Sequence, residues 1–139
     1  MIYSTETEIL IPFHDVDSMG IVWHGHYAKY FEVARCEFLD SFNYGYKAMD
    51  ASGYSWPVVD MRIKYVQSLK FDQKVVVQCR LKEWEYRLKI EYVIVNENGE
   101  PLTKGHTVQF AIDQTTEEVC FETPAPFREA LTRKLGRLV

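Results

Sequence analysis

The chain has 139 residues, the usual size of one domain, and we expect a single domain over residues 1–139. Its 16 basic and 20 acidic residues are mixed along the chain and give a net charge of −4, which argues against nucleic acid as the main partner. Cys36, Cys79 and Cys120 have no metal-like spacing, and no signal peptide or membrane-spanning apolar run is visible, so we expect a cytoplasmic protein with reduced thiols.

The first element expected in chain order is a strand over residues 6–14. Ile9, Ile11 and Phe13 alternate there with polar or turn residues, and Pro12 favours an edge position or a strand end. From residue 26 to 42 the apolar spacing changes to three and four, which predicts an amphipathic helix of about four to five turns. Its expected buried stripe is Tyr27, Tyr30, Phe31, Ala34, Phe38 and Phe42.

Residues 43–57 hold two glycines and a proline and are expected to form a turn-rich excursion. Four strand-like runs of period two follow, each expected to turn its apolar side chains toward one covered face. "NENGE" (96–100) contains Asn-Gly, a strong hairpin signal between the last two runs, and a short helix is expected over about 125–135. The apolar residues of the four runs are Val59, Met61, Ile63 and Tyr65; Val75, Val77, Cys79 and Leu81; Leu88, Ile90, Tyr92 and Ile94; and Val108, Phe110 and Ile112.

These elements predict the α+β class, with one long central helix wrapped by a curved antiparallel β-sheet. The stretch "DVDSMGIVWHGHYAKYFEVAR" (15–35) closely resembles the signature of the 4-hydroxybenzoyl-CoA thioesterase family of hot-dog-fold proteins. The resemblance continues more weakly along the whole chain, through the order of the elements and the "KEW" segment (82–84). The matching pieces are Asp15, Asp17, Gly20, the apolar trio Ile21-Val22-Trp23, and Tyr27.

This resemblance implies the hot-dog fold and the hydrolysis of acyl-CoA thioesters without metal or prosthetic group. It also implies homodimers that often pair into homotetramers. The substrate expected is an acyl-CoA or an acyl carrier protein thioester, and no cofactor is expected. Neither the acyl group nor the choice between the two carriers can be read from the residues.

A thioester carbonyl needs an attacking oxygen and a group that stabilises the developing oxyanion. A helix N-terminus offers unpaired N–H groups and a partial positive charge for the second task. By resemblance, the backbone N–H of His24 faces the thioester oxygen, and Gly25 allows the backbone to approach closely. Asp17 matches the family's catalytic acid, as a nucleophile or as a general base on water. The imidazole of His24 is a second candidate, for orienting substrate or water.

The same cluster has other interpretations. An Asp-x-Asp pair before a helix is often a turn or an N-cap, and we expect Asp15 to be structural. The histidines and carboxylates of residues 14–26 would alternatively form a metal site. We expect no metal, because the chain after Trp23 reads as loop into helix, where residues i and i+2 diverge.

Binding residues are harder to read. Arg87 and Lys89, just after "KEW", occupy a region where related enzymes carry basic residues that meet the CoA nucleotide, although a solvated strand face explains them equally well. The resemblance implies an acyl pocket formed between two subunits, with a helix from one and strand residues from the other. Its candidate residues are Tyr30, Phe31, Tyr54, Val58, Val59 and Met61, and Gly25 and Tyr27 at the start of the helix are further substrate-binding candidates.

Two other functions stay open. A hot-dog dehydratase would act on a hydroxyacyl thioester, but no His-Phe-Pro-Gly-like run is present. A non-catalytic acyl-CoA or acyl carrier protein binding protein is expected to carry a further DNA-binding or partner domain, for which 139 residues leave no room.

Overall fold

The fold of residues 2–139 is described from a computed structural model. Strand β1 (Ser4–Leu10) leads through two short 3₁₀ helices, η1 (Phe13–Asp15) and η2 (His24–His26), into the long helix α1 (Tyr27–Asp40). The remaining elements are α2 (Tyr46–Ala51), β2 (Tyr54–Ser55), β3 (Val58–Tyr65), β4 (Lys74–Glu83), β5 (Leu88–Val95), β6 (Pro101–Gln109), β7 (Ile112–Asp113) and α3 (Ala125–Leu135).

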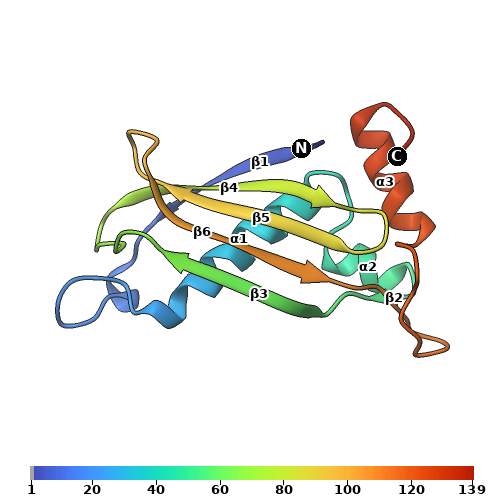
Figure 1. The fold of residues 1–139 in the computed structure, drawn as a ribbon, viewed down its shortest axis with the longest axis horizontal. Helices are drawn as coiled ribbons and strands as arrows, with labels where there is room; N and C mark the ends of the chain where they lie inside the picture. The colour runs from blue at the N-terminus through green and yellow to red at the C-terminus, as the bar shows by residue number, and fades with distance from the viewer. Residues whose placement is uncertain (1) are drawn as a thin grey trace.

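Five strands form one antiparallel sheet in the order β1-β4-β5-β6-β3, while β2 and β7 pair separately. Helix α1 lies across one face of this sheet, and Figure 1 looks onto the opposite face, which no helix within residues 2–139 covers. The predicted α+β class, with one long helix against an antiparallel sheet, is therefore confirmed.

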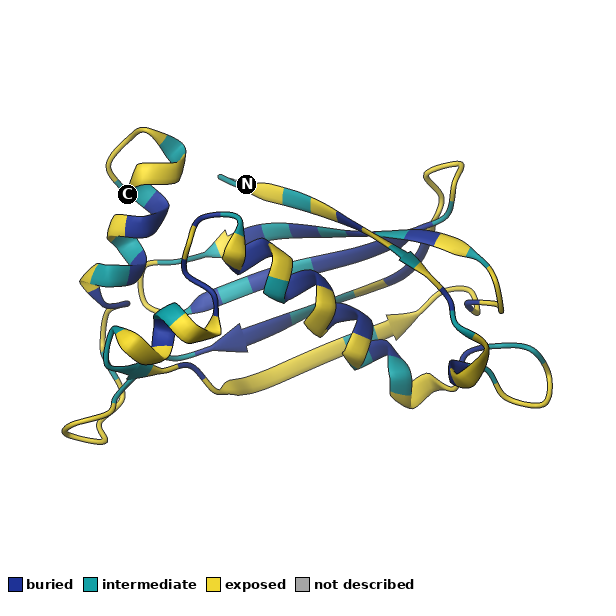
Figure 2. Ribbon diagram, turned by 180° about the vertical axis from the view of Figure 1, so that it is seen from behind, coloured by how far each residue is buried: buried dark blue, intermediate teal, exposed yellow. Residues whose placement is uncertain are grey.

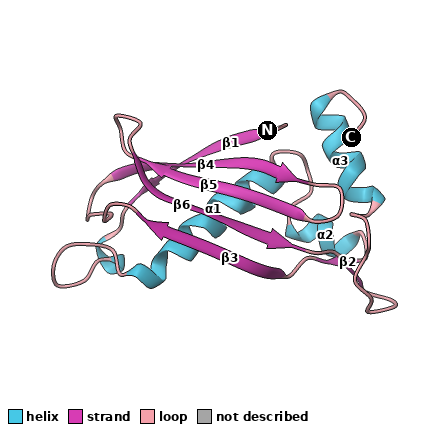
Figure 3. Cartoon of the chain, viewed as in Figure 1, coloured by secondary structure: helices cyan, strands magenta, loops and turns pink. Residues whose placement is uncertain are grey.

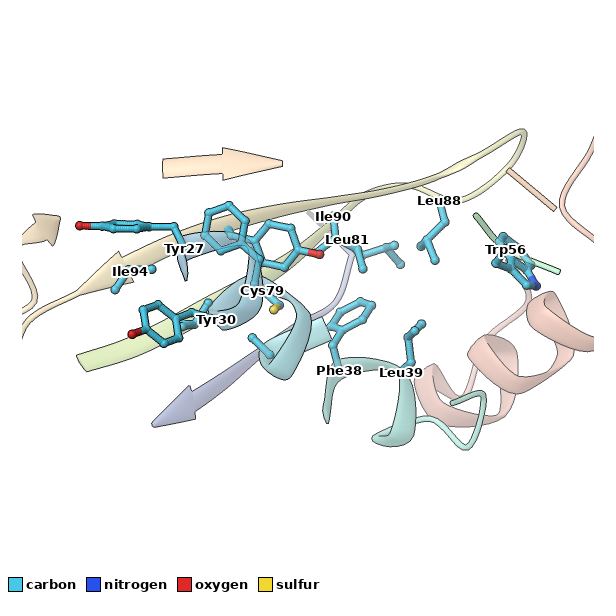
Figure 4. Close-up of a cluster of buried hydrophobic side chains, with 14 of the residues drawn as sticks. Tyr27, Tyr30, Phe38, Leu39, Trp56, Cys79, Leu81, Leu88, Ile90 and Ile94 are labelled. Carbon is cyan, nitrogen blue, oxygen red and sulfur yellow. The ribbon is translucent and has the colours of Figure 1, made fainter. Parts of the chain in front are cut away.

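The core lies between α1 and the central strands. The inward residues of β4 and β5 are fully buried, as their alternation predicts, and they meet the aromatic stripe of α1 (Figure 4). Phe31 of α1 stacks on Tyr92 of β5 with ring centroids 4.4 Å apart. Cys79 lies in the same layer, and burial raises the pKa of its thiol to about 12.

Strand β3 forms the outer edge of the sheet and is exposed along its length (Figure 2). The expectation of a covered face for Val59, Met61 and Tyr65 is wrong for the single chain, since all three side chains are exposed. The reason is the position of α1, which packs chiefly against β1 and β4. These strands lie toward the edge of the sheet opposite β3.

The secondary structure differs from the expectation in three places (Figure 3). The first strand ends at Leu10 rather than residue 14, because the chain turns through Pro12 into η1. The excursion over 43–57 contains the helix α2, which was not predicted. The last strand of the sheet covers Pro101–Gln109 rather than 107–112. Within residues 2–139, no helix has both the length and the apolar character needed to cross a membrane.

Candidate active site

The loop between β1 and η2 folds back on itself as a narrow hairpin. Val16 and Val22 pair across it, and the Asp17 N–H donates to the Ile21 carbonyl at 2.8 Å. The turn closes with a 3.0 Å bond from the Gly20 N–H to the Asp17 carbonyl. Gly20 has φ +78°, in the left-handed region that favours glycine. The glycine of the signature thus serves the turn that holds Asp17.

The Asp17 carboxylate is held at one oxygen only. Its Oδ1 accepts the Met19 N–H at 2.8 Å, as in an Asx turn. Among residues 2–139, no other side-chain or backbone donor and no cation lies within bonding distance of this carboxylate, and the side chain is exposed. A carboxylate fixed at one oxygen and free at the other is available to attack a carbonyl or to take a proton from water.

A cleft of about 270 Å³ lies beside this hairpin and the start of the long helix. Three of the predicted site residues, Asp17, His24 and Tyr27, contribute to its wall. Its lining is Asp17, Ile21, Val22, Trp23, His24, Tyr27, Tyr65, Val66, Gln67 and Ser68.

The amino end of the helical segment opens at this cleft. The turn η2 runs directly into α1, and no side chain caps either of them. The first N–H groups of a helix have no acceptor within it, so this end carries free donors and a partial positive charge. The Tyr65 hydroxyl donates to the His24 carbonyl at 2.9 Å. That carbonyl shares a planar peptide unit with the Gly25 N–H, so the bond also fixes the direction of this donor.

Gly25 has a packing partner that the sequence did not indicate. A Cβ added at this position would lie 2.2 Å from the Trp23 ring. The Trp23 indole is half exposed and lines the cleft. Glycine at position 25 therefore allows the indole to lie against the backbone at the cleft wall.

Tyr27 fixes the floor of the cleft. Its side chain is buried, its hydroxyl accepts the Leu69 N–H at 3.1 Å, and its ring meets the Tyr65 ring edge-on with centroids 4.7 Å apart. Burial raises the pKa of Tyr27, so its hydroxyl stays protonated at neutral pH. It ties helix α1 to the segment after β3.

Asp15 ties the hairpin to the long helix. Its buried carboxylate accepts Lys29 Nζ at 2.6 Å and the Tyr30 hydroxyl at 2.7 Å, and its carbonyl accepts the Trp23 N–H at 3.2 Å. Burial alone would raise the pKa of Asp15, but the hydrogen bonds from Lys29 and Tyr30 outweigh it and hold the pKa below its ordinary value. These contacts agree with the structural role expected for Asp15.

The other predicted binding residues lie away from this cleft in the single chain. Val58, at the start of β3, and Leu88, at the start of β5, both pair with Gln109 at one end of the sheet. Tyr65, which lines the cleft, pairs with Thr103 toward the other end. The predicted residues found away from the cleft wall are Tyr30, Phe31, Tyr54, Val58, Val59, Met61, Arg87 and Lys89. Of these, Tyr30 and Phe31 are buried in the core beneath α1.

Arg87 has a local partner as well. Its guanidinium binds the Glu83 carboxylate at 2.8 Å.

Reasoning from the sequence missed the segment after β3. Tyr65 was read as a sheet residue only, and Gln67 and Ser68 were not considered. The available signal was the polar pair Gln67-Ser68, which interrupts the apolar residues between β3 and β4. For the alternative of a metal site, residues 2–139 contain no group of three or more His, Cys, Asp or Glu side chains placed to hold an ion.

Comparisons with known proteins identify the family of this chain. The family model described as "Thioesterase-like superfamily" matches residues 11–135. A Bacillus subtilis protein named "Putative acyl-CoA thioesterase YneP" is 28% identical over 127 residues, which cover 91% of this chain and 88% of that protein.

Solved structures with the same fold include two thioesterases. The DHNA-CoA thioesterase from Staphylococcus aureus has a TM-score of 0.80 and 29% identity, covering 98% of this chain and 97% of that one. A 4-hydroxybenzoyl-CoA thioesterase in complex with 4-hydroxybenzoyl-CoA has a TM-score of 0.77 over 91% of this chain and 97% of that one. At 18% identity, the second comparison speaks for the fold alone.

Proposed function

This chain belongs to the thioesterase-like superfamily and is a thioesterase with the hot-dog fold, and we propose that it hydrolyses acyl-CoA thioesters in the cleft beside Asp17. The observation that carries the proposal is the meeting of two groups at one cleft. Asp17 brings a carboxylate with a free oxygen, and the uncapped start of η2 and α1 brings backbone donors.

The proposed reaction follows from these two groups. The thioester carbonyl lies against the N–H groups at His24 and Gly25, which stabilise the negative charge that develops on its oxygen. Asp17 either attacks the carbonyl carbon, giving an anhydride that water then opens, or takes a proton from the water that attacks. The carbon–sulfur bond breaks, the thiolate of CoA leaves, and a carboxylic acid is released. His24 lines the same cleft, and its imidazole is proposed to orient the substrate.

The test of this function replaces Asp17 with Asn. The Asn side-chain oxygen can still accept the Met19 N–H, so the hairpin is expected to keep its conformation. We expect Asp17→Asn to lose a factor of about 10²–10⁴ or more in kcat while it still binds substrate. Thiol release with a colorimetric reagent measures turnover, and calorimetry measures acyl-CoA binding to the variant.

Asp72→Asn is the matched control, because Asp72 is also exposed in a loop. This control and exhaustive chelation are both expected to leave turnover unchanged. Wild-type kcat in Asp17→Asn would contradict the assignment, and loss of activity on chelation would favour the metal alternative. A panel of short, long, branched and aromatic acyl thioesters of CoA and of acyl carrier protein identifies the substrate. Enoyl formation without thiol release would instead indicate a dehydratase, and binding without either product a non-catalytic binder.

We also propose that the working unit is a homodimer joined at β3. In support, β3 is an unpaired edge strand that exposes Val59, Met61 and Tyr65, and such edges associate readily. Antiparallel pairing of β3 with its own copy brings the start of one strand beside the end of the other. The proposed pairing therefore carries the Val58 end of one subunit, with Arg87 and Lys89 nearby, toward the Tyr65 end of its partner. This accounts for the predicted binding residues that lie away from the cleft within one chain.

A further inference from the structure

The open face of the sheet carries a concentration of cations. Side chains that alternate with the buried ones on β3 to β6 point away from α1, toward the face seen in Figure 1. They line a shallow groove of about 410 Å³ with four permanent cations and a single carboxylate, that of Glu91. We call this the basic groove, and its basic residues are Arg62, Lys64, Arg80, Lys104 and His106.

Basic side chains are direct cross-strand neighbours in the groove. Lys64 of β3 is the register partner of Lys104 of β6, and Arg62 is the partner of His106. Like charges in directly opposite positions destabilise a sheet. Glu91 of β5 is the register partner of Arg80 and of His106, but no acidic residue is the register partner of Lys64 or Lys104.

The acids nearby are already engaged. Glu91 lies 3.8 Å from Arg80, and Asp60 lies 3.4 Å from His106. Among residues 2–139, no acidic side chain lies within ion-pair distance of Arg62, Lys64 or Lys104. Three neighbouring cations are thus left for an anion from outside.

We propose that the basic groove binds a nucleotide-sized ligand that carries two or more phosphate groups. Neighbouring strands lie about 4.8 Å apart and alternate residues about 6.6 Å apart, so the cations match several phosphates rather than one. Arg62 and Arg80 offer planar forks that suit phosphate oxygens, and Lys64 and Lys104 add point charges. A volume of about 410 Å³ lies within the range of small-ligand sites.

Two sources share this chemistry. One is the nucleotide end of the CoA substrate, an identification that rests on the proposed function, and the other is a separate phosphorylated ligand. The cleft and the basic groove lie on opposite faces of β3, since Tyr65 lines the cleft and its neighbour Lys64 lines the groove.

The experiment measures binding of adenosine 3′,5′-bisphosphate by calorimetry at low salt. Wild type is compared with the double variant Lys64→Ala/Lys104→Ala and with Lys47→Ala/Lys134→Ala. The control makes the same change in net charge at exposed lysines of α2 and α3. We expect the double variant to raise Kd about tenfold or more and the control to change it little. The Tm of the unliganded double variant is expected to equal or exceed that of wild type, because a repulsive pair has been removed.

A second arm separates the sources by comparing one acyl group carried on CoA and on pantetheine. If the nucleotide of CoA fills the groove, the double variant raises KM for the CoA thioester alone, and the bisphosphate competes with it. If the ligand is separate, neither KM changes while bisphosphate binding is still lost. Both outcomes support the proposal.

The proposal is overturned if wild type does not bind the bisphosphate, or if the control variant loses binding equally. It is also overturned if the double variant loses binding to an acidic acyl carrier protein while wild type ignores the bisphosphate. If the wild-type protein binds the bisphosphate but hydrolyses neither the CoA thioester nor the pantetheine thioester, the proposed function is contradicted. The same result supports the proposal that the basic groove binds phosphate groups.

Discussion

Two aspartates two positions apart meet opposite environments in this protein. Asp15 is buried and accepts bonds from Lys29 and Tyr30, whereas Asp17 is exposed and keeps one oxygen free. Asp15 ends the 3₁₀ helix η1 and contacts α1, whereas Asp17 lies in the hairpin that follows and lines the cleft. The same type of side chain thus serves as a structural anchor at Asp15 and as the proposed reactive group at Asp17, because the surroundings of the two carboxylates differ.

The buried Asp15 carboxylate is expected to make the stability of the protein depend on pH. Because the pKa of Asp15 is lowered in the folded protein, its contribution is fully present above the unfolded-state pKa, about 4, and is lost as pH falls through the folded pKa. We expect Asp15→Asn to lower the free energy of unfolding by about 1–3 kcal/mol at pH 7. Below about pH 4 the difference from wild type should shrink.

Urea unfolding of both proteins at pH 7 and at lower pH measures this. Asp72→Asn again serves as the control, with little effect expected at either pH. A stability difference that is the same at both pH values would show that the Asp15 charge has no part in the anchor.

At the scale of elements, β6 shows how a residue needed for a close contact can interrupt the apolar alternation by which a strand is predicted. Gly105 and Lys104 interrupt the apolar alternation, so the pattern indicated a strand only from residue 107. Gly105 is there because a Cβ would lie 2.2 Å from the Arg62 carbonyl and 2.7 Å from the Phe31 ring. The residue that weakens the pattern is the one that lets β3 and α1 approach β6.

This contact predicts a sensitive position. Gly105→Ala forces β3 or the Phe31 ring to move, and we expect it to lower the free energy of unfolding by roughly 1–3 kcal/mol. Chemical denaturation followed by circular dichroism measures the loss. Lys104→Ala, the exposed neighbour, is expected to change stability little, and an equally stable Gly105→Ala would mean that the contact relaxes at no cost.

The elements that local patterns specify were predicted well. The 3.6-residue periodicity gave the long helix over 26–42, close to Tyr27–Asp40, and alternation gave β4 and β5, whose apolar residues are fully buried. Asp17 and His24 were found through a local signature, and both line the cleft. Tyr65 and Gln67 were not found, since only the fold brings the end of β3 to the start of α1. The exposure of β3 also depends on tertiary structure, because alternation cannot tell which strand lies beyond the helix.

For the whole molecule, the proposed dimer is the feature with most bearing on activity. A charge on the β3 edge should prevent pairing, and we expect Val59→Lys to shift the protein to the mass of one subunit. Its kcat/KM should fall although every cleft residue is unchanged, because the partner's contribution is missing. Sedimentation and thiol release at equal protein concentrations measure both effects.

Leu10→Lys places the same charge on an exposed residue of β1, the opposite edge strand of the sheet, and is expected to change neither mass nor activity. Full activity in a wild-type protein that sediments as one subunit would rule out the dimer as the working unit.

The deeply buried thiol of Cys79 can report how often the core of the protein opens. Only the thiolate form reacts with alkylating reagents, and the raised pKa and complete burial keep this sulfur inert while the core is closed. Cys36 and Cys120 are partly accessible and react without any opening of the core. Mass spectrometry measures the rate at which Cys79 is modified relative to Cys36 and Cys120. This rate therefore reports how often α1 separates from the sheet.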